Sequence, residues 1–216
     1  MKLYLVRHAQ SKRNLKMNSE IDTELSDIGI VQAKKLGSWF HKVKINKIYC
    51  SELKRAKDTL NEMKIYLKDI SVVYTSELNE MNFGIFQENG IDDLGGFFRE
   101  AWSKLGERYF EFTPERGESL ISLNRRALKF YRKILKKHKN ENILIIGHGF
   151  YLAQMIIEIL GLKITDSKYF ELPNASVSQF YIENERVKNF HVGDFHHLLV
   201  EGMEKNKKPK LLLRRI

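Results

Sequence analysis

The sequence predicts an α/β fold: a three-layer α/β/α arrangement with a mostly parallel central sheet, an edge hairpin and a small cap insertion. Three observations predict it. Short continuous apolar runs, typical of strands buried on both faces, recur along the chain. Segments with apolar residues at helical spacing separate them, and this alternation favours parallel strands. Towards the C-terminal end, Ser176–Ile182 and Arg186–Val192 flank a polar turn and indicate an antiparallel hairpin at a sheet edge.

The predicted parallel strands are compact apolar runs. Leu3–Val6 and Ile143–Ile146 are the clearest, because every position in them is apolar. Ile45–Tyr49 is another candidate, and Ser71–Tyr74 is a weaker one. Together they would supply four neighbouring strands of one sheet.

Four segments carry helical patterns. Ser26–His41 begins at a serine that can cap it, and apolar residues recur at spacings of three and four from Leu53 to Leu67. The same periodicity runs through a long helix from Leu120 to Leu135. Phe150–Leu160 is apolar nearly all round, so we expect a buried helix that ends at Gly161.

One domain is expected over residues 1–204. Within it, Asn82–Phe112 has weak periodicity, paired glycines at Gly95 and Gly96 and many aromatic residues. We interpret this segment as a mobile cap or lid insertion beside the site, at about residues 82–116. The Lys-rich end of the chain, 205–216, is interpreted as a basic C-terminal tail.

The composition is that of an ordered globular protein. Apolar residues make up 43% of 216 positions, charged residues 30%, and proline occupies only 3, which excludes a disordered or fibrous chain. No apolar run is long enough for a membrane span. The N-terminus reaches charged residues too early for a secretion signal, and the single cysteine, Cys50, fits a reducing compartment. We therefore expect a cytoplasmic protein.

Positive charge is in excess. The 37 Lys and Arg against 27 Asp and Glu give a formal net charge of +10, which attracts phosphate-bearing molecules. No basic face is interleaved with aromatic residues in a stacking pattern, so we expect no specific nucleic-acid partner. The expected partner is a small phosphorylated substrate, and both a monomer and a homodimer stay open.

Two histidines occupy matching positions. His8 follows the first predicted strand and His148 follows Ile143–Ile146. The carboxyl ends of parallel strands form the ligand crevice of such sheets, whereas a core histidine would more often lie inside the apolar run. Arg7 and two glycines flank them. The pattern indicates a pair of active-site histidines.

Six motifs, in order along the chain, resemble those of the histidine phosphatase superfamily, which includes the cofactor-dependent phosphoglycerate mutases. The match runs from Lys2 to about Val192. The motifs are Arg7-His8-Ala9-Gln10-Ser11 with Asn14, Leu25-Ser26-Asp27-Ile28-Gly29, Ser51-Glu52-Leu53-Lys54-Arg55-Ala56, Leu78-Asn79-Glu80 with Phe83-Gly84, Gly117-Glu118-Ser119, and Gly147-His148-Gly149. Two departures, Ala9 for glycine and Gln10 for glutamate, remove no catalytic group.

The resemblance implies a catalytic set. His8 would attack phosphorus, and the two arginines, Arg7 and Arg55, would hold the phosphoryl oxygens and keep the His8 imidazole neutral. His148 would bind a phosphate oxygen. Glu80 would protonate the leaving oxygen and then activate water.

Each of these residues has a structural alternative. Arg7 could pair with a surface carboxylate, and Arg55, in a helix rich in charge, could be solvated. Glu80 has two competitors close in sequence, Glu77 and Glu88; the Leu-Asn-Glu context before Phe83-Gly84 favours Glu80.

Four further residues are candidates for binding the substrate. Asn14 is a plausible donor, and Gly149 follows the second histidine. Ser11 could contact phosphate or cap the following turn. Gln10 could contact substrate or pack against the neighbouring loop.

No metal and no cofactor are expected. His196 and His197 are adjacent and would point to opposite faces of a strand, and His191 adds no convincing ligand spacing. The chain also contains no Gly-rich loop ending in Gly-Lys-Ser/Thr, which argues against a nucleotide kinase.

The expected function is hydrolysis of a small phosphorylated metabolite by a metal-independent phosphatase, through a phosphohistidine intermediate. A phosphoglycerate mutase is the alternative, but only 37 positions separate Glu80 from Gly117, where family mutases carry a longer insertion. A non-catalytic protein that binds a phosphorylated ligand is the alternative of another class. Sugar phosphates, phosphoglycerates, a ribazole phosphate and phosphoprotein are all compatible substrates.

Overall fold

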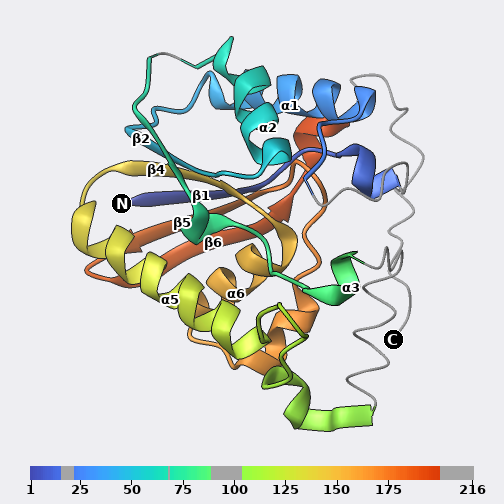
Figure 1. Ribbon diagram of the computed structural model, residues 1–216. Helices are drawn as coiled ribbons and strands as arrows, with labels where there is room; N and C mark the ends of the chain where they lie inside the picture. The colour runs from blue at the N-terminus through green and yellow to red at the C-terminus, as the bar shows by residue number, and fades with distance from the viewer. Residues whose placement is uncertain (16–21, 68, 89–103, 200–216) are drawn as a thin grey trace, which may run out of the picture.

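A six-stranded sheet forms the middle layer of the protein (Figure 1). The computed structural model describes residues 1–15, 22–67, 69–88 and 104–199. The strand order is β3-β2-β4-β1-β5-β6. The first four strands are parallel to one another, β5 is antiparallel to β1, and β6 is antiparallel to β5. The strands are β1 (Lys2–Arg7), β2 (Lys47–Ser51), β3 (Val72–Thr75), β4 (Asn142–Gly147), β5 (Val177–Glu183) and β6 (Arg186–Asp194).

Helices cover both faces of this sheet, with α1 and α2 on one side and α5 and α6 on the other (Figure 1). The predicted α/β class with a mostly parallel sheet and an edge hairpin is confirmed. Within the described ranges, no helix is both long enough and apolar enough to cross a membrane. The α-helices are α1 (Asp27–Phe40), α2 (Lys54–Lys64), α3 (Ile85–Glu88), α5 (Leu120–Lys137) and α6 (Gly149–Leu160).

The two central strands contribute to the cores on both faces. In β1, Leu3 and Leu5 pack in the cluster under α5 and α6, whereas Tyr4 and Val6 pack in the cluster under α1 and α2. Successive side chains of a strand point to opposite faces, so a strand covered on both sides must be apolar at every position. The same alternation holds along β4. This is why both strands are readable as continuous apolar runs.

The helix ends follow local signals. The Ser26 side chain caps α1 by accepting from the backbone N–H of Gly29. Gly161 ends α6 in the left-handed region, with φ of 67°, a conformation that costs glycine little. Both signals were read correctly from the sequence.

Two predicted boundaries were wrong, and parts of two predicted segments lie outside the described residues. β2 begins at Lys47 rather than Ile45. At Asn46 the side-chain oxygen, rather than the backbone carbonyl, accepts from the backbone N–H of Asn142, so the regular ladder starts at the next residue. Leu67 is not part of α2, which ends at Lys64. After Lys64 the backbone hydrogen bonds join residues three positions apart, as in a 3₁₀ turn. Residues 89–103 of the predicted cap and the predicted tail at 205–216 fall outside the described residues. The division into domain, cap and tail stays a prediction.

Candidate active site

The sheet register places His8 and His148 side by side. Arg7 at the end of β1 pairs with Gly147 at the end of β4, so the next residue of each strand leaves the sheet at the same edge. The two imidazole rings lie with their centroids 5.0 Å apart. Both side chains are buried, with exposed fractions of 3% for His8 and 0% for His148. The predicted pairing of these histidines is present in the structure.

Arg55 lies against the first histidine. Its Nε donates a hydrogen bond of 3.2 Å to His8 Nε2, and its exposed fraction is only 6%. One of its terminal nitrogens lies 3.7 Å from an oxygen of Asp22. The solvated alternative for Arg55 is therefore wrong, because the first turn of α2 directs its side chain towards the end of β1.

Arg7 completes the positive side of the site. Its Nη1 donates to the carbonyl oxygen of Leu172, and its buried Nε has no hydrogen-bond partner among the described residues. Gly149 lies beside this guanidinium: a Cβ atom there would be 3.5 Å from Arg7 Nε. The Nε–H donor is therefore left for a ligand oxygen.

The tautomer of His8 follows from its neighbours. His8 Nδ1 lies 2.7 Å from the carbonyl oxygen of Ala9, which can only accept, so Nδ1 carries the proton. Nε2 then presents a lone pair, to which Arg55 donates. Burial, followed by the charges of Arg55 and Arg7, holds the pKa of His8 well below its ordinary value. This direction agrees with the expected neutral imidazole, and burial rather than the arginines is its first cause.

Glu80 lies in the loop after Leu78, and its carboxylate reaches the N-terminus of α6. One carboxylate oxygen accepts from the backbone N–H groups of Tyr151 and Met81, each at 3.0 Å, and the other accepts from Phe150 at 3.2 Å. Free N–H groups at a helix N-terminus are natural partners for a carboxylate. The competing Glu77 instead binds Lys133 at 2.5 Å. Glu80 is thus the glutamate that borders His148 in this loop.

Three residues of the first motif have local roles. The backbone N–H and the hydroxyl of Ser11 both donate to Asn14 Oδ1, at 2.9 and 3.0 Å, so they stabilise the turn after β1. Gln10 Oε1 accepts from the Ser26 hydroxyl at 2.9 Å, at the start of α1. In this structure Ser11 and Gln10 therefore make the structural contacts that were the alternatives to binding substrate. Asn14 also accepts from Asn174 through Oδ1, which leaves its amide nitrogen as a donor.

Two contributors to the site were missed in the sequence. Asn174 Nδ2 donates to the carbonyl oxygen of His8 at 3.1 Å. Arg126 on α5 donates to the carbonyl oxygens of Glu77 and Asn79 and, at 2.7 Å, to the Glu118 carboxylate. Arg126 thereby fixes the loop that carries Glu80. In the sequence, only its partner Glu118 was noticed, as part of the Gly-Glu-Ser motif. Arg126 itself has the pattern of any charged residue on an amphipathic helix.

Potential metal ligands do not gather within the described ranges, where no group of three or more His, Cys, Asp and Glu is arranged to hold an ion. His196 binds Asp194 at 2.7 Å, while His197 lies against the Trp39 ring. These adjacent histidines thus have separate, structural contacts.

The buried histidines predict acid sensitivity of the fold. His8 and His148 both have pKa values well below the ordinary value, which is about 6.5 in the unfolded chain. Below pH 6.5 the unfolded chain therefore binds more protons than the folded protein, and the free energy of unfolding decreases as pH falls. The expected slope is about 1.4 kcal/mol per pH unit for each histidine. Urea unfolding at pH 6.5 and pH 5.0 measures it.

Carboxylates also contribute to such a slope, so the control is the double variant His8→Asn, His148→Asn. We expect a shallower loss of stability with acid in this variant than in the wild type. Equal slopes for the two proteins would contradict the assignment of neutral, buried imidazoles.

Two imidazoles and two guanidinium groups, gathered at the carboxyl ends of parallel strands, form a centre suited to a tetrahedral oxyanion such as a phosphoryl group. Comparison with known proteins points to the same class. Residues 3–194 match the family model of the histidine phosphatase superfamily, branch 1. The chain belongs to this superfamily.

Similar proteins cover most of the chain. Phosphoserine phosphatase 1 of Hydrogenobacter thermophilus is 28% identical over 86% of this chain and 89% of that protein. The adenosylcobalamin/alpha-ribazole phosphatase of Escherichia coli is 29% identical over 80% of this chain and 85% of that protein. Among solved structures, the alpha-ribazole phosphatase from Shigella flexneri has a TM-score of 0.77 and 25% identity, covering 93% of this chain and 100% of that one.

Proposed function

We propose that this protein hydrolyses phosphomonoesters of small metabolites, with His8 as the nucleophile. It is a metal-independent phosphatase of its superfamily. The observation that carries the role of His8 is the state of its ring: Nε2 presents a lone pair, 3.2 Å from the Arg55 Nε donor and beside the His148 ring. A neutral imidazole surrounded by cationic donors can attack a phosphoryl group and stabilise its oxygens at the same time.

The first step transfers the phosphoryl group to the enzyme. The lone pair of His8 Nε2 forms a bond to phosphorus as the bond from phosphorus to the ester oxygen breaks. Protonated Glu80 donates its proton to that leaving oxygen, so the alcohol departs neutral. Arg7, Arg55 and His148 hold the three remaining phosphoryl oxygens.

The second step returns the enzyme to its starting state. Glu80, now a carboxylate, accepts a proton from water while the water oxygen attacks phosphorus. The bond from phosphorus to Nε2 breaks, its electron pair returns to His8, and orthophosphate leaves. Glu80 is again protonated, so atoms and charges balance over the cycle.

The proposed substrates are small alkyl phosphates. Support comes from the named relatives, which are phosphatases for phosphoserine and for alpha-ribazole phosphate. We place phosphoserine and ribazole phosphate first in the panel, followed by sugar phosphates and 3-phosphoglycerate. A cytoplasmic location and the absence of a nucleic-acid partner are part of the proposal.

A phosphate-release screen tests this function. We expect the purified protein to release orthophosphate from at least one panel member, and we expect the rate to be unchanged by a chelator. With 3-phosphoglycerate primed by 2,3-bisphosphoglycerate, we expect hydrolysis rather than isomerisation. Isomerisation without net phosphate release would favour the mutase, and binding without either reaction would favour a non-catalytic protein.

A further inference from the structure

The second histidine of the site is bonded to a serine from a different strand. His148 Nε2 lies 2.7 Å from the Oγ atom of Ser51, the last residue of β2. The serine hydroxyl in turn lies 2.7 Å from Asn79 Oδ1, in the loop that carries Glu80. Ser51 and His148 are fully buried, and Asn79 is half-buried.

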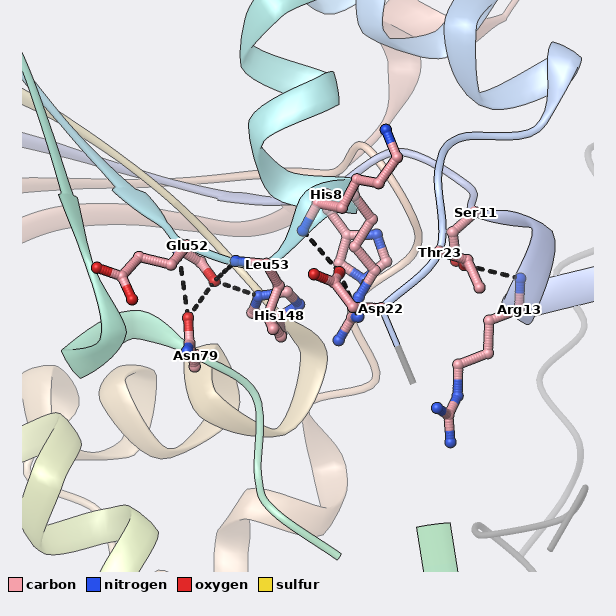
Figure 2. A network of polar contacts seen from close by, with 12 residues as sticks. His8, Ser11, Arg13, Asp22, Thr23, Glu52, Leu53, Asn79 and His148 are labelled. Carbon is pink, nitrogen blue, oxygen red and sulfur yellow. Dashed lines mark hydrogen bonds and ion pairs between the residues drawn. The ribbon is translucent and has the colours of Figure 1, made fainter. Parts of the chain in front are cut away.

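The direction of each bond in this chain is determined by its neighbours. The backbone N–H of Glu52 donates to Asn79 Oδ1 at 3.1 Å (Figure 2). Because an N–H cannot accept, the atom that faces both Glu52 and Ser51 is the carbonyl oxygen of the Asn79 amide. The Ser51 hydroxyl therefore donates its only proton to Asn79. The backbone N–H of Leu53 also donates to Ser51 Oγ, at 3.2 Å. Ser51 can consequently only accept from His148, so the proton of the His148 ring lies on Nε2.

The other ring nitrogen is left without a partner. His148 Nδ1 is buried and has no hydrogen bond within the described part of the chain. Building on the proposed function, we infer that Ser51 and Asn79 are positioning residues that hold His148 in its Nε2–H tautomer, so that Nδ1 is the nitrogen that takes up a proton and donates it to a phosphoryl oxygen when substrate binds.

The groups around His148 explain why the proton arrives with the ligand. The charged and titratable side chains near the ring come from several elements. They include Arg55 from α2, Arg7 and His8 from the end of β1, and Arg126 from α5. The Glu80 carboxylate, bound to the backbone N–H groups of Phe150 and Tyr151, lies beside them. Burial, followed by the arginines and His8, holds the pKa of His148 well below its ordinary value, so the resting ring is neutral.

A lone pair on Nδ1 would repel the oxygen of a phosphate dianion. The complex must therefore hold one proton more than the free enzyme plus the dianion, taken from solution or from the monoanion of the ligand. Once bound, the phosphoryl charge stabilises the imidazolium that donates to it. Ligand binding and proton uptake are thus coupled at one nitrogen.

The tautomer is measurable by NMR of ring-¹⁵N-labelled histidine in the ligand-free protein. In the wild type we expect His148 to be neutral and protonated at Nε2. Ser51→Thr keeps the hydroxyl and should keep that tautomer, whereas Ser51→Ala should give a mixture that includes the Nδ1–H form. Ser178→Ala is the matched control, because Ser178 is equally buried but accepts from Gly193 on β6, away from the site.

Inhibition by orthophosphate gives the functional readout. Between pH 7 and pH 9 we expect the inhibition constant of the wild type to rise by roughly tenfold per pH unit, as one-proton coupling requires. In Ser51→Ala the Nδ1–H form can bind the dianion directly, so this slope should fall towards zero. A merely structural role for Ser51 would weaken inhibition equally at every pH.

The inference would be overturned by a wild-type His148 protonated at Nδ1, by a Ser51→Ala spectrum identical to the wild type, or by a flat wild-type pH profile. These outcomes are separate from failure of the proposed function. The NMR measurement uses resting protein and needs no turnover, while trapping of a phosphoenzyme tests His8 alone. A phosphoenzyme with the opposite His148 tautomer would reject only the inference.

Discussion

Replacing His8 with alanine is expected to abolish phosphomonoester turnover, with a loss of roughly 10⁴-fold or more, and to remove the phosphoenzyme. The reason is the absence of a substitute nucleophile at the site among the described residues. Ser51 has its hydroxyl proton committed to Asn79. The Cys50 thiol is fully buried, and burial raises its pKa to about 12, so it stays protonated.

The measurement is a rapid-quench experiment with a substrate labelled in its phosphoryl group. Wild-type protein should show label bound to the chain that is stable to base and released by acid, as expected for phosphohistidine. His196→Ala is the matched control, since His196 is exposed and contacts Asp194. It should retain wild-type turnover and labelling. Full turnover by a His8→Ala variant whose unfolding temperature equals that of the wild type would contradict the proposed mechanism.

The fold could be predicted because its central strands are covered on both sides. β1 and β4 lie between two helical layers, and this makes Leu3–Val6 and Ile143–Ile146 apolar at every position. The position of the two histidines then follows, because neighbouring parallel strands end at the same edge. In contrast, β3 at the other edge of the sheet is only half-buried, and its sequence pattern was correspondingly weak.

The roles of the side chains were less predictable, because they depend on contacts between distant segments. Arg55 and His8 are 47 positions apart, and Ser51 and His148 are 97 apart. Nothing in the local pattern around Arg55 distinguishes a buried guanidinium from a solvated one. Gln10 shows the converse: its position in the first motif suggests the substrate, but its side chain is bonded to Ser26.

The two imidazoles are held in opposite tautomers. His8 is protonated at Nδ1, because it faces the carbonyl oxygen of Ala9, and it offers Nε2 as a base. His148 is protonated at Nε2, because it faces Ser51, and Nδ1 remains available. Backbone and side-chain acceptors therefore give two identical residue types different tasks, a nucleophile and a proton-dependent donor, within 5.0 Å of each other.

Replacing Glu80 with glutamine is expected to lower kcat for an alkyl phosphate such as phosphoserine by about 10²- to 10³-fold. An alkoxide is a poor leaving group, so its departure depends on the proton that Glu80 supplies. With p-nitrophenyl phosphate, whose phenolate departs without protonation, we expect a much smaller loss in the phosphorylation step. The pre-steady-state rate of phenolate release reports the phosphorylation step. The steady-state rate of phosphate release, measured with both substrates, reports the complete cycle.

Two comparisons distinguish proton transfer from displacement of α6. In Glu80→Gln an NH₂ group replaces one of the two carboxylate oxygens. The variant therefore loses a hydrogen bond from the backbone N–H of Phe150 or Tyr151, at the N-terminus of α6. If helix displacement caused the lower rate, inhibition by orthophosphate would weaken as well; if proton transfer is the cause, that inhibition stays within about threefold of wild type. Glu77→Gln, in the same loop but paired with Lys133, should be nearly neutral. Equal losses of Glu80→Gln in the phosphorylation step with both leaving groups would assign the general acid to another residue. Only a proton donor to the ester oxygen makes that step depend on the leaving group.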